Sequence, residues 1–130
     1  MSWKDEIDAL RKRQALARGM GGPEKLKRQS EAGRLNLRER LDALLDPGSF
    51  CEVGSIAGSA VYDEAGELAD FTPANCVFGR GSINGRRIAV VGDDFTVRGG
   101  AADAAIIEKQ ISAEKMAGEL RLPLIRLIEG

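Results

Sequence analysis

The 130-residue sequence contains no histidine, and this absence excludes more chemistry than any other feature of its composition. Without an imidazole the chain has no Ser-His-Asp or Cys-His nucleophile system, no histidine-ligated metal and no histidine acting as an acid or base. It also has no run of about 18 apolar residues, so no membrane-spanning helix is predicted. From Lys4 onward the N-terminus is charged, unlike a secretory signal. We therefore expect a cytoplasmic protein that does not contact membranes.

Cysteine and aromatic residues are few in this chain. Cys51 and Cys76 are the only cysteines, and two separated thiols cannot form a four-cysteine zinc site. We expect no metal site and two reduced thiols, with a disulfide between them as the alternative. Aromatic residues make up 5% of the chain, and only Trp3 lies among the basic residues of the N-terminal region. No nucleic-acid partner is therefore predicted.

The composition is that of a globular protein whose charge is unevenly distributed. Apolar residues make up 43% of the chain and charged residues 30%, with a net charge of −1, and the length suits one domain. Residues 1–45 carry 11 basic against 7 acidic side chains, whereas residues 46–130 carry 8 against 13. A basic region of this kind attracts polyanions such as a nucleotide or RNA. The commoner alternative is the solvated face of helices.

Two helices are predicted at the start of the chain, and the second of them is short. Ser2 is a candidate N-cap for the first, which carries a thin apolar stripe among basic residues. The glycine-rich segment 19–22 ends this helix. Pro23 suits the first turn of a second helix that runs through Leu26.

A third helix is predicted after Asn36, which is followed three residues later by Glu39, the pattern of a capping box. Residues 46–48 end it, so residues 1–46 form a helical N-terminal arm. The apolar face of this helix is expected to comprise Leu37, Leu41, Leu44 and Leu45.

Short strands are predicted over residues 50–53 and 60–62. The strongest local signal is Asn84-Gly85, which predicts a tight hairpin between strands at 76–83 and 86–91.

A helix and a strand are predicted after this hairpin. The helix is expected over residues 101–117, with Gly118 ending it. Its buried face is expected to comprise Ile106, Ile107, Ile111, Ala113 and Ala117. The run 122–128 is apolar at nearly every position except Arg126, which predicts a strand buried on both faces of a sheet. Because a strand of this type normally leads into a functional loop, we interpret the chain as a truncated domain.

The best candidate site is the loop formed by Arg98, Gly99, Gly100 and Ala101. Consecutive glycines allow a ligand to approach the backbone closely, and the start of the following helix presents free N–H groups. The alternative is a tight turn without function, and Asp103 competes for the same N–H groups. We interpret Asp93 and Asp94 as solvated residues at a strand end, because neighbours in a strand point to opposite faces.

Four segments of the sequence resemble one known family. Residues 33–41 (GRLNLRERL) and 44–52 (LLDPGSFCE), followed by 79–86 (GRGSINGR) and 94–101 (DFTVRGGA), resemble the opening of carboxyltransferase beta subunits of biotin-dependent acyl-CoA carboxylases. The propionyl-CoA and methylcrotonyl-CoA carboxylase types are the most similar. The segments occur in order and cover nearly the whole chain.

The resemblance implies an α/β crotonase-like fold, an incomplete spiral of ββα units after the helical arm. It divides the chain into the arm, residues 1–46, and the acyl-CoA-side segment, residues 47–130. It also implies that a carboxyl group moves from carboxybiotin to the α-carbon of an acyl-CoA, with backbone N–H groups stabilising the enolate. Arg98, Gly99, Gly100 and Ala101 would then line the acyl-CoA, and no side chain of this chain is assigned a catalytic role.

The implied partners are the acyl-CoA, biotin carboxylase and biotin-carrier subunits or domains, and further copies in a homo-oligomer. Biotin would be attached to the carrier and not to this chain. In the family a glycine-rich turn after the strand matching 122–128 supplies an oxyanion-hole amide, and Gly130 precedes that turn. The isolated chain is therefore expected to be inactive. Two alternatives stay open: a non-catalytic assembly module, and a segment of a CoA-thioester decarboxylase subunit.

Overall fold

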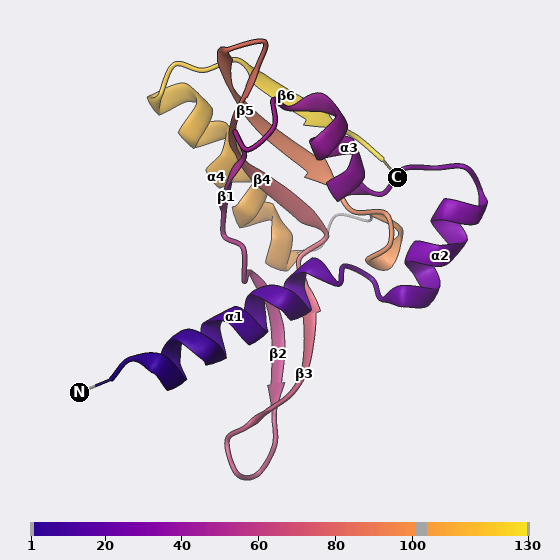
Figure 1. The fold of residues 1–130 in the computed structure, drawn as a ribbon, viewed down its shortest axis with the longest axis vertical. Helices are drawn as coiled ribbons and strands as arrows, with labels where there is room; N and C mark the ends of the chain where they lie inside the picture. The colour runs from indigo at the N-terminus through magenta and orange to yellow at the C-terminus, as the bar shows by residue number, and fades with distance from the viewer. Residues whose placement is uncertain (1, 101–103, 130) are drawn as a thin grey trace.

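The computed structural model describes residues 2–100 and 104–129 and places two sheets and four α-helices along the chain (Figure 1). The strand order of the larger sheet is β1-β4-β5-β6, and β2 and β3 form a separate antiparallel pair. The elements in chain order are α1 (Lys4–Arg18), α2 (Pro23–Glu31), α3 (Leu37–Leu44), β1 (Cys51–Val53), β2 (Gly58–Tyr62), β3 (Leu68–Pro73), β4 (Cys76–Ile83), β5 (Arg86–Asp93), a 3₁₀ turn (Arg98–Gly100), α4 (Ala104–Glu119) and β6 (Leu124–Leu127).

The three predicted arm helices are present, with different ends from those expected. The Ser2 hydroxyl accepts a 3.3 Å hydrogen bond from the Lys4 N–H, although Trp3 occupies the N-cap position of α1. Pro23 begins α2 as predicted, but this helix continues to Glu31 instead of ending near Leu26. Its sequence is rich in strong helix formers, which sustain the extra turn.

The predicted capping box at the start of α3 is confirmed. The Asn36 side-chain oxygen accepts a 2.9 Å hydrogen bond from the Glu39 backbone N–H, and its amide donates to the Glu39 carboxylate at 2.6 Å. The expected apolar face is buried as well, with Leu37 only 1% exposed and Leu41 3% exposed. Met20, from the glycine-rich segment, packs into the same cluster and ties the first half of the arm to the sheet.

The predicted hairpin between β4 and β5 is also confirmed. Asn84 and Gly85 both have positive φ, 50° and 79°, as the tight turn requires. The Asp46 carboxylate accepts hydrogen bonds of 2.8 Å from the backbone N–H groups of both turn residues and from the Ser82 hydroxyl. These hydrogen bonds, led by that from Gly85, lower the pKa of Asp46. The residue that ends the arm therefore holds the hairpin turn.

Side chains of β4 and β5 alternate between two cores on opposite faces of the larger sheet, as the period of two in a strand dictates. On one face Val77, Ile88 and Val90 pack against the leucines of α3. On the other face Cys76, Phe78 and Val91 pack with Ala113 of α4.

The predicted buried face of α4 is wrong in part. Ile107 is 47% exposed and Ile111 42% exposed, whereas Ala113 and Ala117 are buried as predicted. Small alanines let the helix approach the sheet closely, and this contact sets the rotation of the helix. The helix also continues past Gly118 to Glu119. Residues 101–103, where it was predicted to begin, and the side chain of Ile106 lie outside what the structure describes.

Two strand predictions also need correction. β3 was not predicted, because its sequence LADFTP lacks a clean alternation, but it pairs with β2 through a bulge beside Val61. β6 is not buried on both faces: within the described residues it pairs only with β5, in parallel, and its residues are half-buried or exposed. No helix among the described residues is long and apolar enough to cross a membrane.

Candidate functional site

The loop that follows β5 is fixed by a buried carboxylate. The Asp94 Oδ1 atom accepts hydrogen bonds from the Thr96 backbone N–H at 2.9 Å and from the Thr96 hydroxyl at 2.5 Å. Asp94 is only 3% exposed, so the prediction of a solvated strand-end residue is wrong for it. Burial raises the pKa of Asp94, and the two hydrogen bonds from Thr96 oppose that shift.

The same threonine joins the loop to the arm. Its hydroxyl oxygen accepts a 2.9 Å hydrogen bond from the Gly21 N–H. A Cβ atom at Gly21 would overlap the carbonyl oxygen of Thr96, so only glycine permits this approach. The sequence of segment 19–22 predicts only the end of a helix, because nothing local in it indicates a contact 75 residues away.

The predicted site residues form the turn between this loop and α4. Arg98 and Gly99 both have left-handed backbone conformations, with φ of 51° and 61°. A left-handed arginine is strained, and strain of this kind concentrates at functional sites. Arg98, Gly99 and Gly100 lie together in one 3₁₀ turn, whereas Ala101 lies outside the described residues.

Two clefts open on either side of this loop. The first, which we call the arm cleft, has a volume of about 580 Å³ and lies between the 19–22 segment, the end of β3, and Val97 and Arg98. The second, the basic cleft, has a volume of about 330 Å³. It is lined by Lys25, Arg28, Gln29, Ala32 and Arg34 of the arm and by Phe95, Thr96 and Gly99 of the loop. The predicted turn therefore borders both cavities.

The basic cleft was not predicted as a site. The only sequence signal for it is the excess of basic residues in the arm, which fits a solvated helix face equally well. Gln29, at the floor of the cleft, is 7% exposed. Its amide donates to the Glu129 carboxylate at 3.2 and 3.4 Å, and Arg40 pairs with the same carboxylate at 3.6 Å. These contacts dock the arm onto the end of β6.

A second group of charges lies between α3, β1 and α4. Arg38 and Glu52 form a two-bonded ion pair at 2.9 and 3.0 Å. The Lys109 ammonium donates to the Gly54 carbonyl at 3.1 Å, and burial lowers its pKa. Burial raises the pKa of Cys76 to about 11, so this thiol stays protonated and unreactive near neutral pH.

Both cysteines are free thiols, as predicted. Cys51 is exposed and Cys76 is buried, and they belong to neighbouring strands of the larger sheet. The disulfide considered as an alternative is not formed. Within the described residues no group of three or more metal-binding side chains gathers.

The family comparison matches a range of residues that includes all four segments on which the family resemblance was based. A family model described as the carboxyl transferase domain matches residues 28–130. The mitochondrial methylcrotonoyl-CoA carboxylase beta chain of Arabidopsis thaliana is 37% identical over 111 residues, which is 85% of this chain and 18% of the relative. The propionyl-CoA carboxylase beta chain of Cereibacter sphaeroides is 36% identical over 126 residues, which is 95% of this chain and 24% of the relative.

Solved structures agree with these relatives. A transcarboxylase 12S structure with methylmalonyl-coenzyme A and methylmalonic acid bound aligns with a TM-score of 0.85 and 28% identity, over 100% of this chain and 26% of that one. The beta subunit of geranyl-CoA carboxylase from P. aeruginosa aligns with a TM-score of 0.67 and 26% identity, over 98% and 22%. The predicted family resemblance and crotonase-like fold class are confirmed. The chain spans about a fifth to a quarter of the length of these relatives.

Proposed function

Because the chain belongs to the carboxyl transferase domain family, we propose that it forms the acyl-CoA side of a biotin-dependent carboxyltransferase. In this reaction a carboxyl group moves from carboxybiotin to the α-carbon of an acyl-CoA thioester. The observation that carries the proposal is the strained turn at Arg98 and Gly99, which borders two clefts and leads into α4. The transcarboxylase structure with a bound CoA thioester supports the same substrate class.

The reaction requires this part of the protein to stabilise the negative charge that develops on the thioester oxygen as the α-carbon becomes nucleophilic. Backbone N–H groups at the Gly99–Gly100 turn and at Ala101 would donate to that oxygen. Removal of one such donor typically lowers the rate by about 100- to 1,000-fold. Amides need no histidine for this role, so the composition of the chain is compatible with it.

The partners and the domain division belong to the same proposal. Biotin is held by a carrier, which brings the carboxyl group to the acyl-CoA, and no described residue of this chain is assigned to biotin. The helical arm, residues 1–46, closes over the acyl-CoA-side segment, residues 47–130. The contacts from Gly21 to Thr96 and from Gln29 to Glu129 support this arrangement.

Assembly into oligomers is the second role for which the structure offers an observation. The β2–β3 hairpin projects from the molecule, with Val61 57% exposed and Tyr62 53% exposed. A surface of this kind favours contact with another subunit, and the transcarboxylase 12S structure is described as a hexamer assembly. A chain that stays a compact monomer in size-exclusion chromatography with light scattering would contradict this role for the chain alone.

Backbone geometry at the turn provides the test of the catalytic proposal. Gly99→Val adds a branched side chain where φ is positive and where the ligand must approach the backbone. In a carboxyltransferase of the relatives' length that carries this chain, we expect propionyl-CoA carboxylation to fall by at least about tenfold, mainly through kcat. Arg98→Ala should have a smaller effect, mainly on KM.

Gly85→Val is the matched control. Its φ of 79° is also positive, so it carries the same backbone strain, but it lies in the hairpin turn away from both clefts. This variant should keep its carboxylation rate once folded. Full activity of Gly99→Val together with loss of activity in Arg98→Ala would show that the site works through side chains, and would refute the proposal.

A further inference from the structure

We propose that Thr96 is a positioning residue for carboxyl transfer, because its hydroxyl group links the docking of the helical arm to the backbone of the turn at Arg98 and Gly99. This inference rests on the proposed function, since it assigns a role to a residue that acts through the proposed site. It is carried by a chain of hydrogen bonds, by the anchoring of both ends of that chain and by the closeness of Thr96 to the turn.

The hydroxyl group of Thr96 lies in the middle of a continuous chain of hydrogen bonds. It accepts from the Gly21 N–H at 2.9 Å and donates to the Asp94 Oδ1 atom at 2.5 Å. A hydroxyl group has a single proton, so both its donor and one of its acceptor positions are used. Thr96 is only 4% exposed, and buried hydrogen bonds in series strengthen one another. The hydroxyl group therefore serves contacts inside the protein and is not offered to a ligand.

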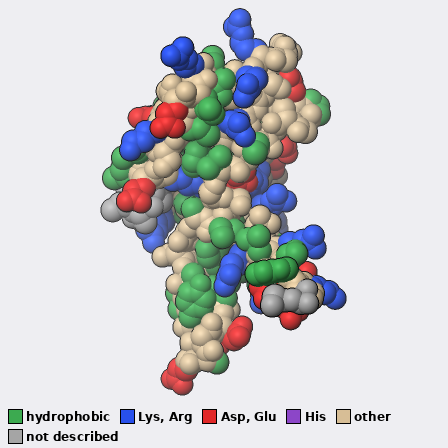
Figure 2. Space-filling model, turned by 90° about the vertical axis from the view of Figure 1, so that its left-hand side faces the viewer, with side chains coloured by type: hydrophobic (Ala, Val, Ile, Leu, Met, Phe, Trp, Pro, Cys, Tyr) green, Lys and Arg blue, Asp and Glu red, His purple; other side chains and the backbone are tan. Residues whose placement is uncertain are grey.

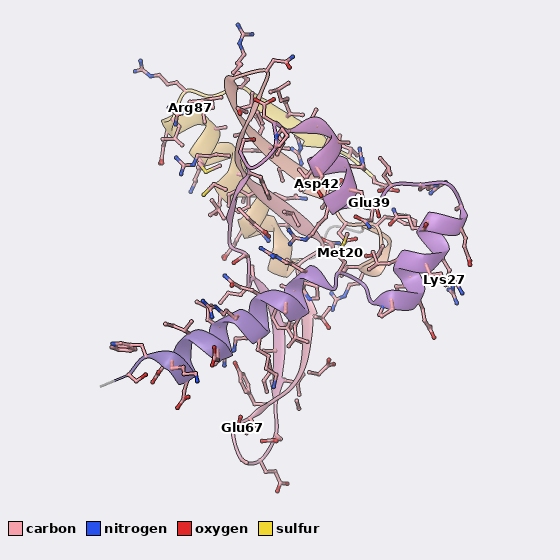
Figure 3. All side chains as sticks on the ribbon, in the orientation of Figure 1. Met20, Lys27, Glu39, Asp42, Glu67 and Arg87 are labelled. Atoms are coloured by element: carbon pink, nitrogen blue, oxygen red, sulfur yellow. The ribbon has the colours of Figure 1, made fainter. Side chains whose placement is uncertain are left out.

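Both ends of this chain are anchored in the body of the protein. On the arm side, Met20 precedes Gly21, and its side chain is 7% exposed and points from the end of α1 toward the core beneath α3 (Figure 3). On the loop side, the Asp94 N–H donates to the Asn75 carbonyl at 2.8 Å, directly before the first residue of β4. Thr96 thus bridges two segments that are each held by the larger sheet and its core.

Only Val97 separates Thr96 from the turn. Val97 is 4% exposed, so the connection itself is packed. The Thr96 carbonyl faces Gly21 so closely that a Cβ atom there would overlap it. The left-handed conformation of Arg98 costs free energy and persists only where the surrounding structure enforces it. The contacts of Thr96 with the arm supply part of that enforcement, and they thereby set the direction of the backbone at Gly99.

Steady-state kinetics of Thr96→Val in a carboxyltransferase of the relatives' length that carries this chain tests the hydroxyl group. Valine keeps the β-branched shape but leaves the Gly21 N–H and the Asp94 carboxylate without this partner. We expect kcat for propionyl-CoA carboxylation to fall by about tenfold or more and KM to stay within about twofold, because a misplacement of about 1 Å costs up to about 100-fold in rate.

Thr96→Ser restores the hydroxyl group and should therefore recover kcat to within about threefold of the parent. A merely structural role would not produce this pattern in kcat and KM. An unchanged kcat in Thr96→Val, a loss confined to KM, or an equal loss of kcat in the valine and serine variants would overturn the proposal.

Ser82→Ala is the matched control. Its hydroxyl group also donates to an aspartate, Asp46, at 2.8 Å, but it holds the hairpin turn and not the loop after β5. The variant loses a hydrogen bond of the same type, so a general effect of lost stability would appear in it as well. We expect its kcat to stay within about twofold of the parent at a temperature where circular dichroism shows every variant folded. An equal loss of kcat in Ser82→Ala and Thr96→Val would contradict the positioning role.

Gly21→Ala tests whether the arm acts through Thr96, and it provides the test from the arm side if Thr96→Val does not fold. The added methyl group overlaps the Thr96 carbonyl, so kcat should fall in this variant too. Because both substitutions break the same chain of hydrogen bonds, the double variant should lose no more than about twofold beyond the larger single loss. Losses that multiply, or an unchanged kcat in Gly21→Ala, would refute the coupling.

Failure of this inference is distinguishable from failure of the proposed function. Unchanged carboxylation in Gly99→Val overturns the proposed function itself. A low kcat in Gly99→Val together with an unchanged kcat in Thr96→Val leaves the turn as the site and overturns only the role of Thr96.

Discussion

Strands β4 and β5 are buried along most of their length, whereas every residue of β2 is exposed. The central strands have apolar cores on both faces, one with α3 and one with α4. The β2–β3 hairpin contacts α1 through β3 and otherwise projects from the molecule, with apolar side chains gathered on its surface in Figure 2. Apolar side chains of similar size therefore contribute to stability in one region and remain free for contacts in the other.

Because of this difference, we expect the α3–β4–β5 region to contribute most of the free energy of unfolding. Removing apolar area from water stabilises by roughly 25 cal/mol per Å², and only the central region removes it from both sides of a sheet. A separate junction, the contact of segment 19–22 with the Asp94–Thr96 loop, joins the arm to the loop after β5. Substitutions in the core, at the junction and on the hairpin should therefore differ in size.

Leu41→Ala should have the largest effect of the three. Leu41 is 3% exposed in the core that α3 shares with the sheet, so the substitution removes buried contacts and leaves a cavity. We expect the free energy of unfolding to fall by about 2–5 kcal/mol. Urea denaturation followed by circular dichroism measures it, and an unchanged midpoint would show that α3 is not docked.

Gly21→Ala should have an intermediate effect, because the added methyl group overlaps the Thr96 carbonyl. Relief requires a shift of the arm away from the loop, at a cost of about 1–3 kcal/mol. Gly22→Ala is a neighbouring control, since nothing lies near the position of its Cβ atom, although its φ of 99° adds strain. Hydrogen exchange at the backbone amide of residue 21 tests whether the arm has moved away from the loop. Only Gly21→Ala is expected to lose protection at this amide.

Asp94 should make the stability of the folded chain depend on pH. Burial raises its pKa, so the folded protein holds this proton to higher pH than the unfolded chain, whose aspartates titrate near pH 4. The protonated Asp94 carboxyl therefore makes its full contribution to stability below about pH 4. This contribution is lost as the pH rises through the pKa of Asp94 in the folded protein. Asp94→Asn keeps the oxygen that accepts from Thr96 and has no carboxyl proton to lose, so its stability relative to the parent should rise as the pH increases above about 4. A difference independent of pH would contradict this.

Val61→Thr on the projecting hairpin should have the smallest effect. Val61 is 57% exposed, and threonine keeps both the β-branched shape and the strand preference. The expected change in the free energy of unfolding is within about 0.5 kcal/mol. A larger loss, at protein concentrations where the chain is monomeric, would show that the hairpin packs against the body.

The elements predicted correctly from the sequence are those whose signal is local. The capping box joins Asn36 to Glu39, and the hairpin turn is decided by the two residues Asn84 and Gly85. Their hydrogen bonds and φ angles depend on residues within a few positions, so composition and spacing predict them. The family resemblance was equally accessible, because it lies in contiguous segments of the printed sequence.

Burial and the sites could not be predicted in the same way. Apolar spacing placed Ile107 and Ile111 toward the core, but the contact of Ala113 with the sheet rotates α4 so that both isoleucines are exposed. The loop at Arg98 and Gly99 was predicted from its glycines, whereas the two clefts beside it required the arm to fold back over the loop.

Sequence alone therefore established the N-terminal cap of α3, the hairpin and the family, since each depends on neighbouring residues or on a contiguous pattern. The tertiary structure decided which charges converge and which carboxylate is buried. The Gly21–Thr96 hydrogen bond spans 75 positions and the Gln29–Glu129 hydrogen bond spans 100. Whether such distant groups meet depends on the packing of all the elements between them, and a local sequence pattern does not predict that packing.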